Sequence, residues 1–212
     1  MVHVQSVEEP LEQPEIVGPM FGVLKRADAM GLFTKKIGKL DLPAFREVVQ
    51  SLRRAGIGRE AEHAIELFTS SSPPQSFERG ELLRLIRILT DALEESPAPP
   101  YEWQRMMSLF QPEQEHLAEL LGISLSSLRR YSSKQRGTPD DVAARLHFVA
   151  LLTSDLAGAY NDIGVRNWFR RKRALLDGKA PRNLLHGDWR PGDPGPERVR
   201  ALARSLAAGC VT

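Results

Sequence analysis

The sequence predicts an all-α fold, a multi-helix bundle, on three observations. Apolar residues recur at intervals of three and four positions along most of the chain, the spacing that gathers them on one face of a helix. No segment shows the period-two alternation of a half-buried strand. Of the 212 residues, 42% are hydrophobic, which is enough to bury a core without disulfides or a structural metal.

The amino-terminal half is expected to be helical after a flexible tail. Residues 1–19 contain three prolines and several glutamates and lack an apolar period, so they should not bury enough apolar surface to offset the entropy of ordering. Residues 20–96 are interpreted as an N-terminal helical domain of unknown role. Its helices are expected at residues 42–54, 59–69 and 79–94.

Two Ser/Pro segments interrupt these patterns, at residues 70–74 and 96–100. Proline lacks a backbone donor and clashes within a helix, so both segments should break regular structure. The second is the expected domain boundary, because helical patterns resume beyond it. The helices expected there span residues 101–110, 113–121, 125–134, 139–160, 162–172, 181–185 and 194–208.

The segment EQEHLAELLGISLSSLRRY, which begins at Glu113, has the pattern of a helix-turn-helix. Leu117 lies on the apolar stripe of the first helix, and the small Ala118 allows a second helix to cross closely. Gly122 permits the left-handed backbone that ends the first helix, Ile123 fills the corner, and Ser124 caps the second helix. Residues 101–160 are therefore expected to form a helix-turn-helix DNA-binding domain.

In such a motif the second helix enters the major groove of DNA and presents side chains to base edges. Arg129 could contact guanine through two hydrogen bonds, and the serines could donate to bases or phosphates. No acidic residue interrupts residues 120–138, so the segment should attract phosphate groups. The residues expected to contact DNA are Ser124, Ser126, Ser127, Arg129, Arg130, Tyr131, Lys134 and Arg136.

The charge distribution favours the same half of the chain. Residues 1–100 hold 12 basic and 15 acidic side chains, whereas residues 101–212 hold 17 and 12. The net charge is thus −3 in the first half and +5 in the second. A polyanion such as operator DNA would be attracted to the second half.

The second half also carries the residues of a family resemblance. Downstream of the helix-turn-helix, GVRNWFRRKRALLDGKAPRNLL begins at Gly164 and joins two aromatic residues, a basic cluster and a tight turn, and VRALARSLA closes the chain as a helix. Together these features resemble the Xre/MbcA/ParS-type antitoxin family over about residues 103–208. The likeness implies a small C-terminal, toxin-binding-like helical domain at residues 161–212.

The resemblance also implies partners. Members of that family neutralise a RES-domain toxin that consumes NAD and repress their own operon as oligomers on DNA. It implies a homodimer or higher oligomer, as does the usual pairing of helix-turn-helix half-sites. The residues expected to bind the partner are Trp168, Phe169, Arg170, Arg171, Gly178, Lys179, Pro181, Leu184 and Leu185.

No catalytic, metal or cofactor site is expected, and the protein is not expected to be an enzyme. His186–Gly187–Asp188 is similar to the catalytic loop of small-molecule phosphotransferases, but Asp193 occupies the position of the metal-binding asparagine and no glycine-rich loop precedes it. The five histidines are dispersed. A lone cysteine, Cys210, and the lack of a signal or membrane-spanning segment favour a cytoplasmic protein.

The sequence therefore favours an antitoxin of a type II toxin–antitoxin pair, which neutralises a RES-type toxin and binds operator DNA as an autorepressor. Two alternatives stay open at this point. A stand-alone helix-turn-helix transcription regulator would share the DNA chemistry, with residues 20–95 sensing a protein or ligand. A helical adaptor would not bind DNA, and its basic second helix would only be solvated.

Overall fold

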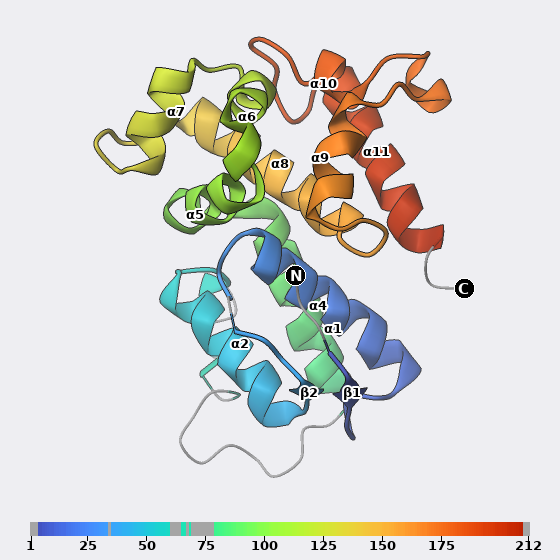
Figure 1. Cartoon of the computed structure of the whole chain (residues 1–212). Coiled ribbons are helices and arrows are strands. Elements are labelled where there is room, and N and C mark those ends of the chain that lie inside the picture. Colours follow the sequence, from blue (N-terminus) through green and yellow to red (C-terminus); the bar gives the residue numbers. More distant parts are fainter. Residues whose placement is uncertain (1–3, 34, 60–64, 67, 69–78, 210–212) are drawn as a thin grey trace. The chain divides into compact units, whose positions relative to one another are not determined.

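The computed structural model describes residues 4–33, 35–59, 65–66, 68 and 79–209. These residues are mostly helical, so the predicted all-α, multi-helix fold is confirmed (Figure 1). The chain divides into two compact units, Met1–Ser96 and Pro97–Thr212, and the division lies within the Ser/Pro segment at 96–100. Each unit is described by itself below.

Among the described residues of the first unit, three long helices form the core. α1 (Pro14–Ala29) packs along α4 (Arg79–Glu95), and α2 (Leu42–Arg54) contacts α1. Buried side chains from all three, among them Val23, Val48 and Leu89, form its core. An ion pair of 2.7 Å between Arg26 and Glu94 joins α1 to α4. A second ion pair of 2.7 Å, between Glu15 and Arg79, also joins these two helices.

The expected flexible tail is wrong for residues 4–19. Residues Ser6–Val7 (β1) pair in parallel with Lys39–Leu40 (β2), a short strand pair that the sequence did not predict, and α1 begins at Pro14. Proline is tolerated at the start of a helix, where its missing N–H would have no partner. Ile16 and Met20 are fully buried, at the spacing of one helix face. The burial of this apolar face stabilises the helix despite its prolines.

The second unit contains seven α-helices among the residues that the structure describes. These are α5 (Pro99–Leu109), α6 (Gln114–Leu121), α7 (Leu125–Ser132), α8 (Asp140–Leu156), α9 (Asp162–Arg170), α10 (Pro181–Leu184) and α11 (Pro194–Gly209). Two single 3₁₀ turns lie at Gln111–Glu113 and Ala174–Leu176. Each of these helices overlaps one expected from the sequence. The expected helix at 59–69, the Ser/Pro segment at 70–74 and Cys210 fall wholly or largely outside the described residues.

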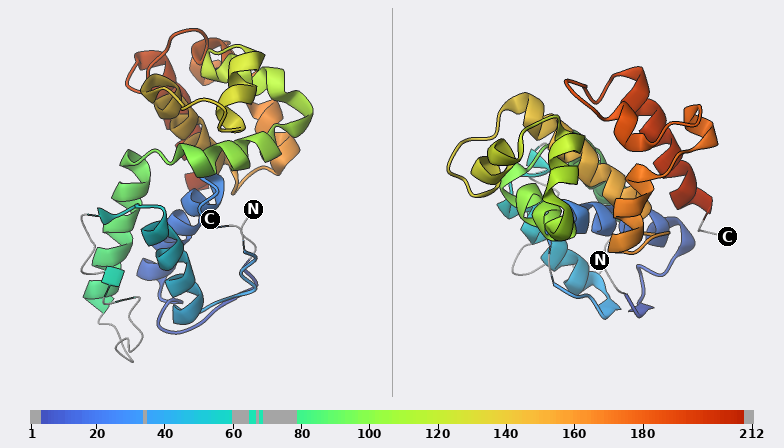
Figure 2. Two further views of the ribbon diagram at one scale, coloured as in Figure 1. Left: turned by 90° about the vertical axis from the view of Figure 1, so that its left-hand side faces the viewer. Right: turned by 45° about the horizontal axis from the view of Figure 1, so that its top comes forward.

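Helix α8 is the centre of the second unit. It contacts α5, α6 and α11, and nearly all its side chains are buried (Figures 1 and 2). A helix that is buried all round belongs to the middle of a core. Because α11 packs on α8, residues 97–212 form one compact unit in place of the two domains expected at 101–160 and 161–212. Among the described helices, each is too short or too polar to cross a bilayer.

Candidate nucleic-acid interface

Helices α6 and α7 form the expected helix-turn-helix, and its local geometry follows the sequence signals. Gly122 has a φ of 63°, in the left-handed region, and ends α6. The N–H of Ile123 donates to the carbonyl of Ala118 at 3.0 Å, which closes the turn. The Ser124 hydroxyl accepts from the N–H of Ser127 at 3.1 Å, as an amino-terminal cap of α7. The predicted roles of Gly122 and Ser124 are confirmed.

The amino-terminal end of α7 presents a cluster of hydroxyl groups. The hydroxyl of Ser124 lies 2.9 Å from that of Ser126 and donates to that of Ser127 at 3.0 Å. Ser124 and Ser126 are exposed, and Ser127 is half-buried. Each hydroxyl has two lone pairs and one donor, so the cluster keeps hydrogen-bonding capacity for a ligand. Its inner bonds hold the three side chains in place.

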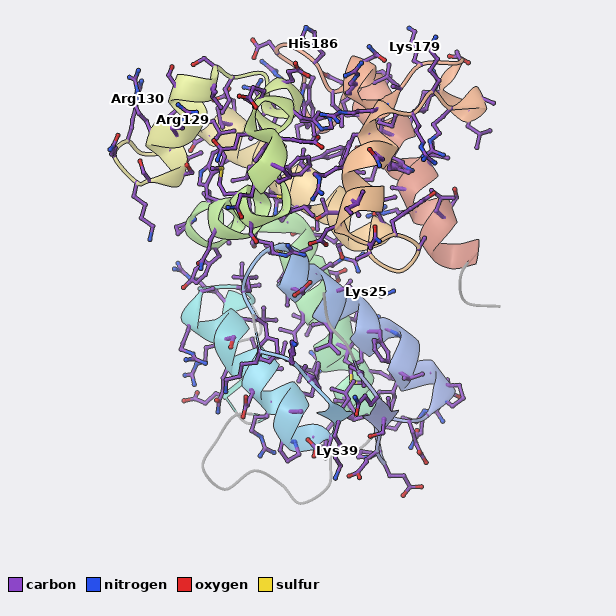
Figure 3. The ribbon with its side chains drawn as sticks, viewed as in Figure 1. Lys25, Lys39, Arg129, Arg130, Lys179 and His186 are labelled. Carbon is purple, nitrogen blue, oxygen red and sulfur yellow. The ribbon has the colours of Figure 1, made fainter. Side chains whose placement is uncertain are left out.

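Arg129 and Arg130 are exposed on the same helix (Figure 3). Neither guanidinium forms an ion pair or a side-chain hydrogen bond with another described residue. Both charges are therefore available to an anion. Lys134 and Arg136 are exposed just beyond α7, where Lys134 adopts a left-handed backbone with a φ of 60°.

Tyr131 differs from its predicted role. Its side chain is buried, with its ring centroid 6.4 Å from that of Trp103 on α5. The indole N–H of Trp103 donates to the Thr138 hydroxyl at 2.8 Å, and the guanidinium of Arg136 lies 6.0 Å from the Tyr131 ring centroid. These contacts brace α7 and the turn after it against α5. Tyr131 thus positions the helix, and its ring does not form part of the exposed surface.

The loop after α10 braces the other end of the motif, which sequence reasoning missed. The indole N–H of Trp189 donates to the carbonyl of Leu120 on α6 at 2.9 Å. The guanidinium of Arg145, 3% exposed on α8, donates to the carbonyl of Gly187 at 3.1 Å and pairs with the carboxylates of Asp141 and Asp188. The phosphotransferase-like loop is therefore anchored to the helix-turn-helix.

This loop touches the turn of the motif directly. A Cβ added at Gly122 would overlap the carbonyl oxygen of Gly187 and lie 2.8 Å from a guanidinium nitrogen of Arg145. Glycine at position 122 is thus required twice, by its backbone angle and by the close approach of a second backbone. The one sequence signal for this contact was Arg145 itself, an arginine within an otherwise apolar helix.

His116 links the first helix of the motif to α9. It is buried, and its ring packs against those of Phe110 and Phe169. Burial lowers the pKa of His116 below its ordinary value of 6.5, and the nearby positive charge of Arg170 lowers the pKa further. The Glu113 carboxylate opposes this shift from 3.5 Å. Burial in the core thus favours the neutral form of the imidazole.

The residues predicted to bind a partner fall into two groups. Trp168, Phe169, Pro181 and Leu185 are buried, so they shape the second unit from within and are not themselves exposed to a partner. The exposed or partly exposed members are Arg170, Arg171, Gly178, Lys179 and Leu184. The Arg170 guanidinium is already paired with Glu113 at 2.5 Å. Arg171 and Lys179 therefore carry the exposed charge of this set.

An exposed apolar residue, Leu175, lies beside that set and was not singled out in the sequence. It is 72% exposed on the 3₁₀ turn, whereas the adjacent Leu176 is buried. The Arg198 guanidinium fixes this turn, because it donates to the carbonyl of Leu175 at 3.1 Å and pairs with Asp177 at 2.9 Å. A single exposed leucine is common on protein surfaces, so what distinguishes Leu175 is the fixed turn that carries it.

Among the described residues, no group of three or more histidine, cysteine, aspartate or glutamate side chains is placed to hold a metal ion. Comparison of the chain with protein-family models, curated proteins and solved structures finds no match.

Proposed function

We propose that the protein binds duplex DNA through α6 and α7 and acts as an antitoxin and autorepressor of a toxin–antitoxin pair. The observation that carries the DNA-binding part is the α7 surface. A capped helix follows a left-handed glycine turn and presents two arginines that no acidic side chain of the described residues neutralises. This is the arrangement in which a recognition helix enters the major groove.

The electrostatics support the same proposal. Arg129, Arg130, Lys134 and Arg136 are all exposed within eight consecutive positions. Each contact with a phosphate releases condensed counterions, so binding should weaken steeply with salt. Bracing by Trp103 and by the loop after α10 holds α7 in one position before DNA arrives. A pre-organised helix loses less conformational entropy on binding.

The antitoxin part rests on the family resemblance and on the surface around Leu175. Leu175 is exposed, the exposed residues Arg171 and Lys179 lie within four positions of it in the chain, and Arg198 fixes its turn. A partner that fits this surface would offer an apolar pocket with an acidic rim. The RES-type toxin implied by the resemblance is the partner we propose.

The DNA-binding role predicts different effects for two substitutions. Arg129→Ala is expected to cost about 1–3 kcal/mol of binding free energy and to relax specificity at one base pair, because the arginine reads a base edge. Lys134→Ala should weaken binding to all sequences similarly and reduce the salt slope by about one, because the lysine contacts a phosphate. Duplexes enriched by the protein from a random-sequence pool, followed by affinity titrations, measure both effects.

Arg84→Ala is the matched control for these variants, since Arg84 is exposed on α4 of the first unit. It should leave affinity unchanged. Equal losses on every duplex from Arg129→Ala and Lys134→Ala would contradict the assignment of Arg129 to base recognition. Failure of the wild-type protein to enrich any duplex would favour the helical adaptor instead.

The partner-binding role predicts that Leu175→Asp abolishes capture of a RES-type toxin. The tagged protein is purified from its native cell with nuclease treatment, and proteins recovered in stoichiometric amount are identified by mass spectrometry. Ile163→Asp is the matched control, because Ile163 is also apolar and exposed but lies on α9. Capture by both variants would contradict the assignment of Leu175, and recovery of the wild-type protein alone would favour a stand-alone regulator.

A further inference from the structure

The loop at residues 186–190 lies directly against the turn between α6 and α7. The carbonyl of Gly187 approaches Gly122 so closely that a Cβ there would overlap it, and Gly122 lies two positions before the cap of α7. We propose that this loop is a second DNA-contacting element, in which His186 contacts the phosphate backbone beside the bases that α7 reads. The inference rests on the proposed DNA-binding function and adds a second contact surface to it.

The loop is held rigidly enough to serve as such an element. Trp189 anchors one side of it through the hydrogen bond to Leu120 on α6. Arg145 anchors the other side through Gly187 and Asp188. Each anchor is a buried group with a defined partner, so the position of the loop is fixed relative to the motif. A contact between the loop and DNA would therefore lie at a fixed position relative to the bases that α7 reads.

The position of the loop relative to the motif is what points to a phosphate contact. A recognition helix enters the major groove with its amino-terminal end leading, and the walls of that groove are the two phosphate backbones. The groove is about 12 Å wide, roughly the diameter of one helix with its side chains. A segment packed on the turn that begins the recognition helix therefore meets a wall of the groove and not its floor.

The side chains of the loop suit this place. His186 is exposed, and in Figure 3 it lies at the upper edge of the unit, between Arg129 and Arg130 on one side and Lys179 on the other. An imidazole N–H can donate to a phosphate oxygen. Arg190, also exposed, adds a positive charge to the loop. The carboxylate of Asp188 is 99% exposed and lies 3.5 Å from the Arg145 guanidinium, which it shares with the carboxylate of Asp141.

Charge substitutions at position 186 test the proposal. His186→Glu should weaken binding about tenfold on every duplex, because it places a negative charge against the backbone. His186→Lys should steepen the dependence of log affinity on log salt by about one, because it adds a phosphate contact. The probes are one duplex enriched by the wild-type protein and one random-sequence duplex, titrated between about 50 and 200 mM salt.

Arg84→Glu is the matched charge reversal, since Arg84 is exposed on α4 of the first unit and belongs to neither proposed binding surface. It should change affinity by less than about twofold. Unchanged affinity and salt slope in both His186 variants, with Arg129→Ala still impaired, would overturn the loop contact and leave the proposed function intact. A wild-type protein that binds neither duplex would overturn both.

Discussion

Gly122→Ala is expected to destabilise the second unit by about 3 kcal/mol or more, and to abolish DNA binding at temperatures where the wild-type protein is folded. Two costs combine. A left-handed backbone costs a residue with a Cβ about 1–2 kcal/mol, and the new Cβ would overlap the carbonyl of Gly187. Because that overlap involves backbone and not a flexible side chain, the loop at 186–190 must move. Urea unfolding of the full-length variant, with a DNA titration below its midpoint, measures both effects.

Gly178→Ala separates the two costs. Gly178 has a similar φ of 73°, but nothing lies within 4 Å of its added Cβ. This variant should lose only about 1–2 kcal/mol and keep its affinity for DNA. Equal destabilisation by the two substitutions would show that the backbone angle alone accounts for Gly122, and that the loop does not press on the turn as the structure indicates.

The helix-turn-helix could be predicted because its determinants are local. The left-handed glycine, the serine cap and the apolar stripe all lie within about ten residues, where a pattern in the sequence reports directly on backbone geometry. Helix α2 was predicted with the bounds that the structure shows, Leu42–Arg54, for the same reason. Its cap, Asp41, accepts a hydrogen bond from the N–H of Ala44 at 2.8 Å.

The contacts that brace the candidate interface could not be predicted in this way, because they join distant residues. Trp189 and Leu120 lie 69 positions apart, and Arg145 and Gly187 lie 42 apart. Periodicity identifies which face of a helix is buried, but it does not name what covers that face. The loop around His186 resembles a catalytic motif in sequence, whereas in the structure its backbone supports the helix-turn-helix.

Burial in the structure also changes the role that the sequence suggests for individual residues. Tyr131 continues the basic sequence of α7, and only the neighbouring ring of Trp103 shows that it faces the core. Leu175 and Leu176 look alike in the sequence, yet one is exposed and the other buried. A 3₁₀ turn of three residues is too short to show a helical period in the sequence. The prediction of a flexible tail was wrong for the opposite reason. The apolar residues of α1 follow a clear helical period although prolines interrupt its sequence.

Arg145→Met is expected to lower the free energy of unfolding by about 2–3 kcal/mol, because it removes the hydrogen bonds that this buried guanidinium donates to Gly187 and Asp141. Methionine keeps much of the aliphatic stem, so the loss reports mainly on the hydrogen bonds to Gly187 and to the backbone of Asp141. The loop at 186–190 should exchange its amide hydrogens faster, while α5 stays protected. Hydrogen exchange of the full-length protein distinguishes these segments.

Arg145→Met is also expected to change the affinity for DNA. If the loop holds the turn of the motif in place, Arg145→Met should weaken binding without changing which base pair Arg129 reads, because α7 keeps its side chains and loses only its support. Arg46→Met is the matched control, since the Arg46 guanidinium donates to the carbonyl of Phe68 at 2.7 Å within the first unit. It should leave DNA affinity unchanged. Wild-type stability and exchange in Arg145→Met would mean that Trp189 alone fixes the loop, and the support of the turn would then rest on its bond to Leu120.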